Sequence, residues 1–325
     1  MSKALEPRQP DRLPAKQPTV ALALGGGGAR GLAHILMLEV FEELGIRPVM
    51  IAGTSIGAIF GAAYAAGMST SLIRAHTEEI LGQRFDLVRQ LINARADPIQ
   101  RLFNFVPLRS ALLNPEALLE LLFPSSIPKD FSRLSIPLQV VATDFYSQSQ
   151  VVLSEGPLRR AVAASIALPA IFQPVVIDGR HFVDGGLVNP LPFDLVAGHA
   201  DVTVAVDVSG AAREAEAAGG PRALEVLFAA TQILQRSIVR EKLRVSRPDV
   251  YIDVDVYAFH ALQFHRFRDV LTAAAPAKQA LKRQLERLLG STTVEETEPE
   301  PQAEPRPLGR KKRRLKLALP GRRRR

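Results

Sequence analysis

The chain contains no cysteine among its 325 residues, so it can form neither a disulfide framework nor a thiolate zinc site. Its first residues, Met1–Pro18, are polar and rich in proline, and they lack the apolar stretch of a secretory signal. The apolar segment Ile51–Ala66 is too short for a membrane span and contains glycines. These absences predict a soluble, cytoplasmic protein.

Hydrophobic residues make up 47% of the chain, which is enough to bury a sizeable core. Helix-like segments alternate with short apolar segments, and this order predicts an α/β domain. Val20–Leu24, Val49–Ala52 and Leu138–Thr143 are almost continuously apolar, as expected for strands covered on both faces. We therefore predict a three-layer α/β/α fold with a central, mostly parallel sheet. The other expected strands are Val151–Leu153, Val175–Val183, Val202–Asp207 and Val250–Val256, and the expected helices are Gly31–Leu44, Ser55–Ala66, Leu72–Leu81, Pro115–Phe123, Leu158–Ser165, Arg222–Leu243 and Pro276–Leu289.

The formal net charge of +8 comes from one end of the chain. Arg306–Arg325 holds eleven Lys or Arg and no acidic residue, so the rest of the chain is mildly acidic. The preceding segment Val294–Glu304 is acidic and contains proline. Opposite charge blocks of this kind are typical of disorder. The expected organisation is a disordered arm (1–18), one domain (19–290) and a disordered acidic-then-basic tail (291–325).

A Gly-x-Ser-x-Gly pattern, Gly53–Gly57, follows an apolar run and precedes a helix-like segment of small residues. A strand, a tight turn flanked by glycine and a helix are the context of a nucleophile elbow. Gly53 and Gly57 let the backbone turn sharply around Ser55 and let a substrate approach its hydroxyl. The pattern alone fits an ordinary glycine turn equally well, so Ser55 is a candidate nucleophile that needs partner motifs.

A glycine-rich loop, Gly25–Gly31, lies upstream between the strand ending at Leu24 and the next expected helix. Its glycines leave several backbone N–H groups bare at a helix N-terminus, where the helix dipole also favours negative charge. Such a loop can hold a phosphate, or the oxyanion that forms when a serine attacks an ester. Close packing of strand and helix is the simpler alternative.

The same loop satisfies the dinucleotide pattern G-x-G-x-x-G at Gly26, Gly28 and Gly31. A dinucleotide fold needs an acidic residue at the end of the next strand, but residues 52–55 contain no carboxylate. A Walker-type loop needs Lys and then Ser or Thr after the last glycine, where this chain has Leu-Ala. Nucleotide binding is therefore the weaker alternative.

Asp184, Gly185 and Gly186 stand at the end of a strand-like segment. An aspartate followed by two glycines can lie against another loop without steric obstruction. There its carboxylate can accept a proton from a serine hydroxyl, as a general base must within hydrogen-bond reach. Taken alone, Asp-Gly-Gly is more often a hairpin turn.

In combination, the glycine loop 26–31, the elbow 53–57 and Asp184–Gly186 resemble the patatin-like phospholipase family, in its bacterial and neuropathy-target-esterase branch. The resemblance extends over residues 20–289. It implies a patatin-like fold and a Ser–Asp dyad, with Ser55 as nucleophile and Asp184 as proton acceptor. Further family landmarks are Ala142–Asp144 and Ala161–Ala170.

The resemblance also implies an oxyanion hole formed by the backbone N–H groups of Gly26, Gly27 and Gly28. Arg30, where the family usually has Arg or Lys, is grouped with the oxyanion hole, and for its side chain a structural ion pair and a substrate contact remain open. No metal or cofactor is expected, because the oxyanion hole supplies the polarisation that a metal would otherwise give. Glycines that support the motifs are Gly31, Gly53, Gly57, Gly185 and Gly186.

A Ser-His-Asp triad is the alternative, because the chain has six histidines. In the α/β-hydrolase order the histidine follows the acid, which leaves His199, His260 and His265. None of these lies in a glycine-punctuated loop after a strand. His34 is more typical of a hydrogen-bonded core histidine, and His181 faces away because it precedes the aspartate by an odd number of strand positions. The dyad is preferred.

The sequence therefore predicts a serine lipid acyl hydrolase that cleaves carboxylic esters of phospholipids or lysophospholipids. A nucleotide-binding protein and an adaptor acting through the tail are the alternatives. Lys311–Arg325 suits peripheral docking on anionic lipid or binding to nucleic acid, or has no partner. Lipid is favoured over nucleic acid because it suits the expected substrate.

The segment Leu72–Phe131 is expected to cover the active site and to shape an acyl-chain pocket, or else to form a plain pair of core helices. Its candidates for a pocket or membrane-facing surface are Phe85, Leu87, Phe103, Phe105 and Val106.

Overall fold

The computed structural model describes residues 17–84, 112–210 and 223–290. Within these ranges the strands are β1 Val20–Leu24, β2 Met50–Thr54, β3 Leu138–Asp144, β4 Ser149–Leu153, β5 Val175–Ile177, β6 Arg180–Asp184, β7 Val202–Asp207 and β8 Val250–Asp253. They form one mixed, mainly parallel sheet in the order β5-β6-β3-β2-β1-β7-β8, with β4 paired to β3. The expected arm 1–18 and tail 291–325 fall almost wholly outside the described residues and stay predictions.

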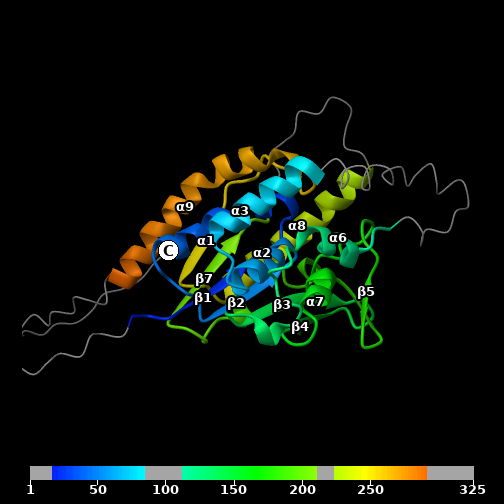
Figure 1. The fold of residues 1–325 in the computed structure, drawn as a ribbon, viewed down its shortest axis with the longest axis horizontal. Helices are drawn as coiled ribbons and strands as arrows, with labels where there is room; N and C mark the ends of the chain where they lie inside the picture. The colour runs from blue at the N-terminus through cyan, green and yellow to red at the C-terminus, as the bar shows by residue number, and fades with distance from the viewer. Residues whose placement is uncertain (1–16, 85–111, 211–222, 291–325) are drawn as a thin grey trace, which may run out of the picture. The chain divides into compact units, whose positions relative to one another are not determined.

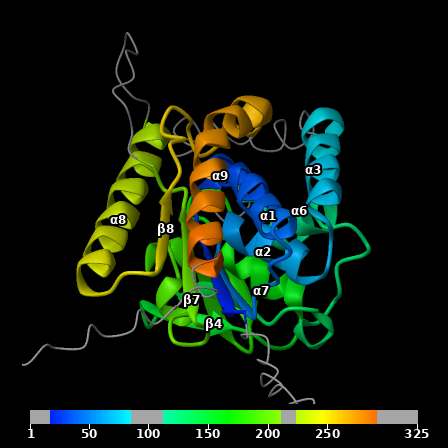
Figure 2. The same cartoon turned by 90° about the vertical axis from the view of Figure 1, so that its left-hand side faces the viewer.

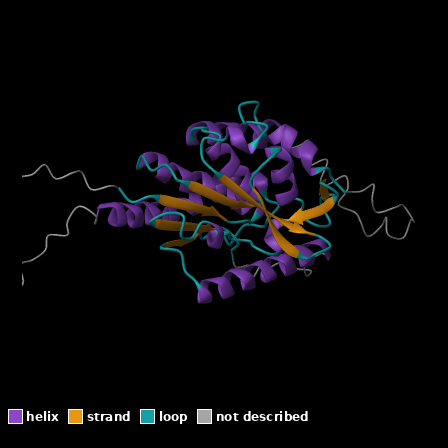
Figure 3. Ribbon diagram, turned by 90° about the horizontal axis from the view of Figure 1, so that it is seen from below, coloured by secondary structure: helices purple, strands orange, loops and turns teal. Residues whose placement is uncertain are grey.

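Helices connect the strands and cover both faces of the sheet (Figures 1 and 3). The longer helices are α1 His34–Glu43, α2 Ile56–Ala65, α3 Thr70–Glu79, α6 Pro115–Leu122, α7 Leu158–Ser165, α8 Ala223–Val245 and α9 Phe267–Gly290. The short helical segments are η1 Gly28–Ala33, η2 Ile80–Arg84, η4 Phe131–Arg133, η5 Gly185–Leu187, η6 Phe193–Leu195 and η7 Phe264–Arg266. The predicted α/β/α arrangement is confirmed.

Strand β1 shows why both faces are covered, because its alternating side chains enter two apolar clusters. Leu22 and Leu24 join the larger cluster, which contains residues of α1, α2 and α9. Ala21 and Ala23 join a smaller cluster that includes Val239 of α8. Figure 2 accordingly shows α8 on one side of β8 and α9 and α1 on the other.

The sheet register brings distant parts of the chain to one edge. Thr54, the last residue of β2, pairs with Val141 of β3, and the next residue of β3, Ala142, pairs with Asp184 at the end of β6. Strand β3 lies between β2 and β6. Ser55, which follows Thr54, and Asp184 are therefore held at the same level of the sheet.

Two expected elements need correction. The single strand Val175–Val183 is a hairpin, because β5 and β6 pair antiparallel around Asp178 and Gly179. Both turn residues have positive φ, 50° and 78°, as a type I′ turn requires. The helix expected from Pro276 begins instead at Phe267, so Pro276 lies inside α9.

Within the described residues, no helix combines the length and the apolar character needed to cross a bilayer.

Candidate active site

The backbone at the half-buried Ser55 is strained, as expected at a nucleophile elbow. Its φ of 54° and ψ of −120° lie in a region that L-residues rarely occupy. Its N–H group donates to Ser165 Oγ at 2.8 Å. A Cβ atom at Gly57 would lie 2.2 Å from the carbonyl oxygen of Leu24. A Cβ atom at Gly53 would lie 2.7 Å from the carbonyl oxygen of Gly57. Both elbow glycines are therefore required by close backbone packing.

The structure brings Ser55 and Asp184 together. The Ser55 hydroxyl donates to Asp184 Oδ2 at 2.7 Å, and the N–H group of Gly186 donates to Oδ1 at 2.7 Å. The backbone of Asp184 is held as well: its N–H donates to the Ala167 carbonyl at 3.0 Å, and Thr143 Oγ1 donates to its carbonyl at 2.8 Å. The carboxylate is thus oriented toward the serine by its surroundings.

The two glycines after the aspartate are also fixed by packing. A Cβ at Gly185 would lie 2.2 Å from the Val141 carbonyl oxygen, and one at Gly186 would lie 2.5 Å from Gln235 Nε2. They begin the helical turn η5 rather than a hairpin. Larger residues here would push Asp184 away from its position.

Burial changes the acidity of Asp184, which is only 3% exposed. Loss of water raises the pKa of its carboxyl from 3.8 to about 6, although the hydrogen bonds from Gly186 and Ser55 act in the opposite direction. A carboxylate with a pKa near neutrality is a better proton acceptor than an ordinary aspartate and is still ionised at pH 7.

The glycine loop offers fewer free donors than the sequence led us to expect. The N–H group of Gly26 donates to the carbonyl of Pro190 at 2.9 Å, so it is already used. No acceptor within the described part of the chain takes the N–H groups of Gly27 or Gly28. The oxyanion hole stays a prediction, and this contact leaves the N–H groups of Gly27 and Gly28 as its candidate donors.

The conformation of the loop requires glycine at three of its positions. Gly28 has a φ of 58°, and a Cβ there would lie 2.4 Å from the Ala261 carbonyl oxygen. At Gly27 a Cβ would lie 2.6 Å from the carbonyl oxygen of Val208, and at Gly31 it would lie 2.1 Å from Ile56 Cγ2. The loop is therefore wedged between the elbow helix and the segment after β8.

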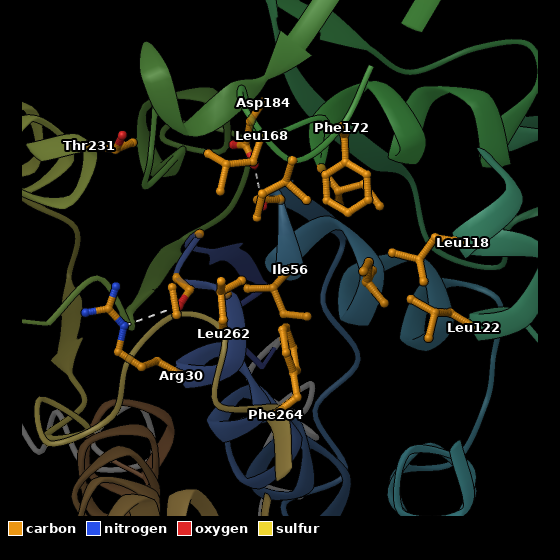
Figure 4. A pocket seen from close by; sticks show the side chains of 18 of the residues that line it. Arg30, Ile56, Leu118, Leu122, Leu168, Phe172, Asp184, Thr231, Leu262 and Phe264 are labelled. Carbon is orange, nitrogen blue, oxygen red and sulfur yellow. Dashed lines mark hydrogen bonds between the residues drawn. The ribbon is translucent and has the colours of Figure 1, made fainter. Parts of the chain in front are cut away.

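Arg30 is buried next to this loop, with 1% of its surface exposed. Its Nε donates to the Gly27 carbonyl at 3.2 Å (Figure 4). Burial lowers the pKa of its guanidinium to about 10. The negative charge of Asp207 acts to raise this pKa, and the positive charge of Arg236 acts to lower it further. Because the peptide unit is planar and trans, holding the Gly27 carbonyl directs the Gly28 N–H to the opposite side. This geometry favours a bracing role for Arg30.

Two of the histidines have contacts of their own. His34 is fully buried and its Nε2 lies 2.8 Å from the Gly25 carbonyl oxygen, while burial lowers its pKa to about 4. His181 packs edge-on against the ring of Tyr146, 5.4 Å between centroids. A carboxylate, not an imidazole, accepts the Ser55 hydroxyl.

A cavity of about 170 Å³ opens over Ser55 and Asp184 (Figure 4). The segment 72–131 contributes Ile80, Leu81, Leu118 and Leu122 to its wall, while its other named candidates, Phe85 to Val106, lie outside the described residues. Helix α8 adds three polar side chains, Thr231, Gln232 and Gln235. The remaining apolar lining consists of Ile56, Ile59, Ile166, Leu168, Ile171, Phe172, Ala261, Leu262 and Phe264.

Two residues near Ser55 and Asp184 were missed by sequence reasoning: Ser165, which binds the elbow, and Gln235, which lines the cavity. Ser165 stands in the alanine-rich segment 161–170, and nothing in the spacing shows that its hydroxyl reaches the elbow. Gln235 lies in a helix whose side chains follow no motif.

The described ranges contain no group of three or more His, Asp or Glu that could bind a metal ion.

The chain is similar in sequence to known proteins. The chain is 38% identical over 207 residues to an uncharacterized NTE family protein of Mycobacterium tuberculosis. The aligned region is 62% of this chain and 53% of that protein. It is 33% identical over 192 residues to patatin-like phospholipase domain-containing protein 7 of Rattus norvegicus, covering 58% of this chain and 13% of the relative. The chain thus spans about half the length of the mycobacterial relative.

Two solved structures are also similar. VipD from Legionella pneumophila has a TM-score of 0.42 and 15% sequence identity, and the match covers 83% of this chain and 67% of VipD. The type III effector ExoU has a TM-score of 0.38 and 16% identity, and the match covers 84% of this chain and 53% of ExoU. The family model described as patatin-like phospholipase matches residues 22–197, more than half of the sequence. The chain therefore belongs to the patatin-like phospholipase family.

Proposed function

We propose that the protein is a serine lipid acyl hydrolase that cleaves carboxylic esters of phospholipids or lysophospholipids. The observation that carries this proposal is the hydrogen bond of 2.7 Å from Ser55 Oγ to Asp184 Oδ2 beneath an apolar cavity. The family name and the names of the relatives point to the same chemistry.

In the first half-reaction Ser55 Oγ attacks the ester carbonyl carbon while its proton passes to Asp184 Oδ2. The carbonyl oxygen becomes an anion, and the N–H groups of Gly27 and Gly28 are its proposed donors. Collapse of this intermediate breaks the bond to the alcohol, which leaves with the proton from Asp184. The acyl group then remains bound to the serine.

In the second half-reaction a water molecule attacks the acyl-serine and passes a proton to Asp184. The second tetrahedral intermediate releases the fatty acid, and the serine regains its proton. The raised pKa of Asp184, about 6, suits both directions of transfer because a base near neutrality can accept a proton and return it.

The apolar wall is the proposed site of the acyl chain. Leu118, Leu122 and Phe172 line it together with Ile56 and Phe264 (Figure 4). Burial of a methylene group in such a wall stabilises binding by about 0.8 kcal/mol. This contribution favours lipids over short, polar esters.

Peripheral contact with an anionic membrane through Lys311–Arg325 belongs to the same proposal. The support for it is the run of basic residues in the sequence, which attracts acidic lipid headgroups at a membrane surface.

The test is hydrolysis of nitrophenyl esters and of a phospholipid panel by wild type, Ser55→Ala and Asp184→Asn. We expect either substitution to lower kcat by several orders of magnitude while thermal unfolding remains cooperative. Ser71→Ala and Asp178→Asn are matched controls, since both residues are exposed. Undiminished hydrolysis by Ser55→Ala would overturn the proposal.

A further inference from the structure

The dipeptide Asn189-Pro190, which comes shortly after η5, contacts all three motifs of the site. The N–H group of Asn189 donates to the Gly185 carbonyl at 2.9 Å, and the Asn189 carbonyl accepts the Thr54 hydroxyl at 2.8 Å. The Pro190 carbonyl accepts the N–H group of Gly26 at 2.9 Å. The dipeptide therefore binds the residue after the proposed base, the residue before the proposed nucleophile and the residue before the proposed oxyanion donors.

The side chain of Asn189 is held from helix α8. Asn189 is only 2% exposed, and its Oδ1 accepts a hydrogen bond from Lys242 Nζ. The same ammonium group donates to the Leu191 carbonyl at 2.8 Å and forms an ion pair with Asp194. The amide nitrogen of Asn189 donates to Asp194 Oδ1 at 3.0 Å and to Gln150 Oε1 at 2.8 Å. Lys242 thus fixes the segment at Asn189 and at Leu191, the residues on both sides of the proline.

The ammonium group of Lys242 matches this segment closely. An ammonium has three N–H donors, and it has three acceptors here, in Asn189, Leu191 and Asp194. It also lies over the ring of Phe193, 4.8 Å from the centroid, where a cation is attracted to the aromatic face. An uncharged side chain of similar length would leave the oxygens of Asn189 and Leu191 without this donor.

Asn189 and Lys242 do not belong to the described residues that line the cavity over Ser55 and Asp184. They act on the site through the backbone contacts of Asn189-Pro190. Base, nucleophile and oxyanion donors must all fit one transition state, so a small shift of one motif against the others slows the reaction.

We propose that Lys242 is a positioning residue for the reaction. By holding Asn189-Pro190, it keeps the elbow, the aspartate turn and the glycine loop in the relative positions that the transition state requires. This inference rests on the proposed function and adds to the site a residue of α8 that lies beyond the family match.

The test is Lys242→Met, which keeps the length of the side chain and removes its three donors. On a dissolved short-chain nitrophenyl ester we expect kcat to fall roughly tenfold and KM to stay the same, because the cavity wall is unchanged. A trifluoromethyl ketone forms a tetrahedral adduct with a nucleophilic serine and imitates the transition state. Its inhibition constant should therefore rise by the same factor as kcat falls.

Asp194→Ala is the second variant, because 43% of the Asp194 side chain is exposed and its loss is compatible with folding. It removes an acceptor shared by Lys242 and Asn189 and should lower kcat by a smaller factor, again at constant KM. The matched control is Lys282→Met in α9, where the lysine pairs with Glu43. This control should keep the wild-type kcat.

Unchanged kcat in the Lys242 and Asp194 variants would overturn the inference, and so would a rise in KM at constant kcat. A loss of kcat that equals the unfolded fraction measured by circular dichroism, or that leaves the inhibition constant of the ketone unchanged, would assign Lys242 to stability alone. If Lys242→Met does not fold, Asp194→Ala decides the question. Failure of the proposed function is distinguishable, because then wild type shows no hydrolysis that depends on Ser55.

Discussion

Ser55 and Asp184 are both held in states that lower the stability of the fold. The serine has a φ of 54°, a conformation that costs about 1–3 kcal/mol for a residue with a side chain. The aspartate is ionised at neutral pH although its surroundings raise its pKa to about 6. Both costs are concentrated on the two residues that we propose carry the reaction.

The raised pKa predicts the pH dependence of hydrolysis. Asp184 accepts a proton only when it is ionised, so kcat/KM should rise with pH through about 6 and level off above it. The measurement is kcat/KM on a neutral ester between pH 4 and 9. A profile that stays flat down to pH 4 would contradict the assignment of Asp184 as the base.

The same pKa predicts an effect on stability. The folded pKa lies above the unfolded value of 3.8, so the stabilising contribution of the protonated carboxyl is complete below about pH 4 and is lost as pH rises through 6. Above that pH the ionised form costs about 3 kcal/mol. Asp184→Asn should therefore unfold at higher urea than wild type at pH 8, with a gap that closes toward pH 4. A gap independent of pH would contradict this linkage.

The proposed role of the glycine loop is tested by a matched pair of glycine substitutions. Gly28→Ala introduces a Cβ 2.4 Å from the Ala261 carbonyl oxygen and displaces a proposed donor, so kcat should fall roughly 10²–10³-fold. Gly45→Ala is the control, because Gly45 also has a positive φ, 64°, but has open space around it. Equal kinetics of the two variants would show that the loop geometry does not matter for the reaction.

At the scale of elements, strands were easier to predict than their connections. β1 and β7 begin and end at the predicted residues, because central parallel strands are predominantly apolar. The β5–β6 hairpin was predicted as one strand, although Asp178-Gly179 is a typical two-residue hairpin turn. α9 was predicted short because proline is typical of the first helical turn.

The position of Pro276 inside α9 can be tested by substitution. A proline inside a helix removes one backbone hydrogen bond and crowds the preceding turn, and this one is exposed. Pro276→Ala should raise the free energy of unfolding by about 1–2 kcal/mol. This value is the gain in the folded helix less the greater conformational entropy of the unfolded chain without proline. Urea denaturation measures the change, and a loss of stability would mean that the proline fits α9 better than its position indicates.

At the scale of the whole molecule, the site draws on more of the chain than the family match covers. The match ends at residue 197, but Thr231 and Gln235 of α8 and Leu262 and Phe264 beyond β8 line the cavity. The N–H group of Ala29, in η1, also donates to the Ala261 carbonyl at 2.7 Å. The C-terminal third therefore completes both the pocket and the support of the glycine loop.

The basic tail lies outside the described residues, and its role is tested by truncation after Gly290. We expect the truncated protein to keep its kcat on dissolved short-chain esters and to lose binding to phosphatidylserine vesicles, since each basic residue near such a surface contributes about 1 kcal/mol. Co-sedimentation at low and high salt measures the binding. Loss of hydrolysis of dissolved esters would instead make the tail part of the catalytic unit.

The amino-acid sequence by itself determined the candidate nucleophile, its acid partner and the glycine loop, because each is a local pattern at the end of a strand and short-range sterics decide its shape. Tertiary structure decided which groups are free to act. Pro190 occupies the Gly26 N–H, Ser165 holds the elbow, and burial sets the pKa of Asp184. These properties arise between residues far apart in the chain, where no spacing or composition specifies which atoms meet.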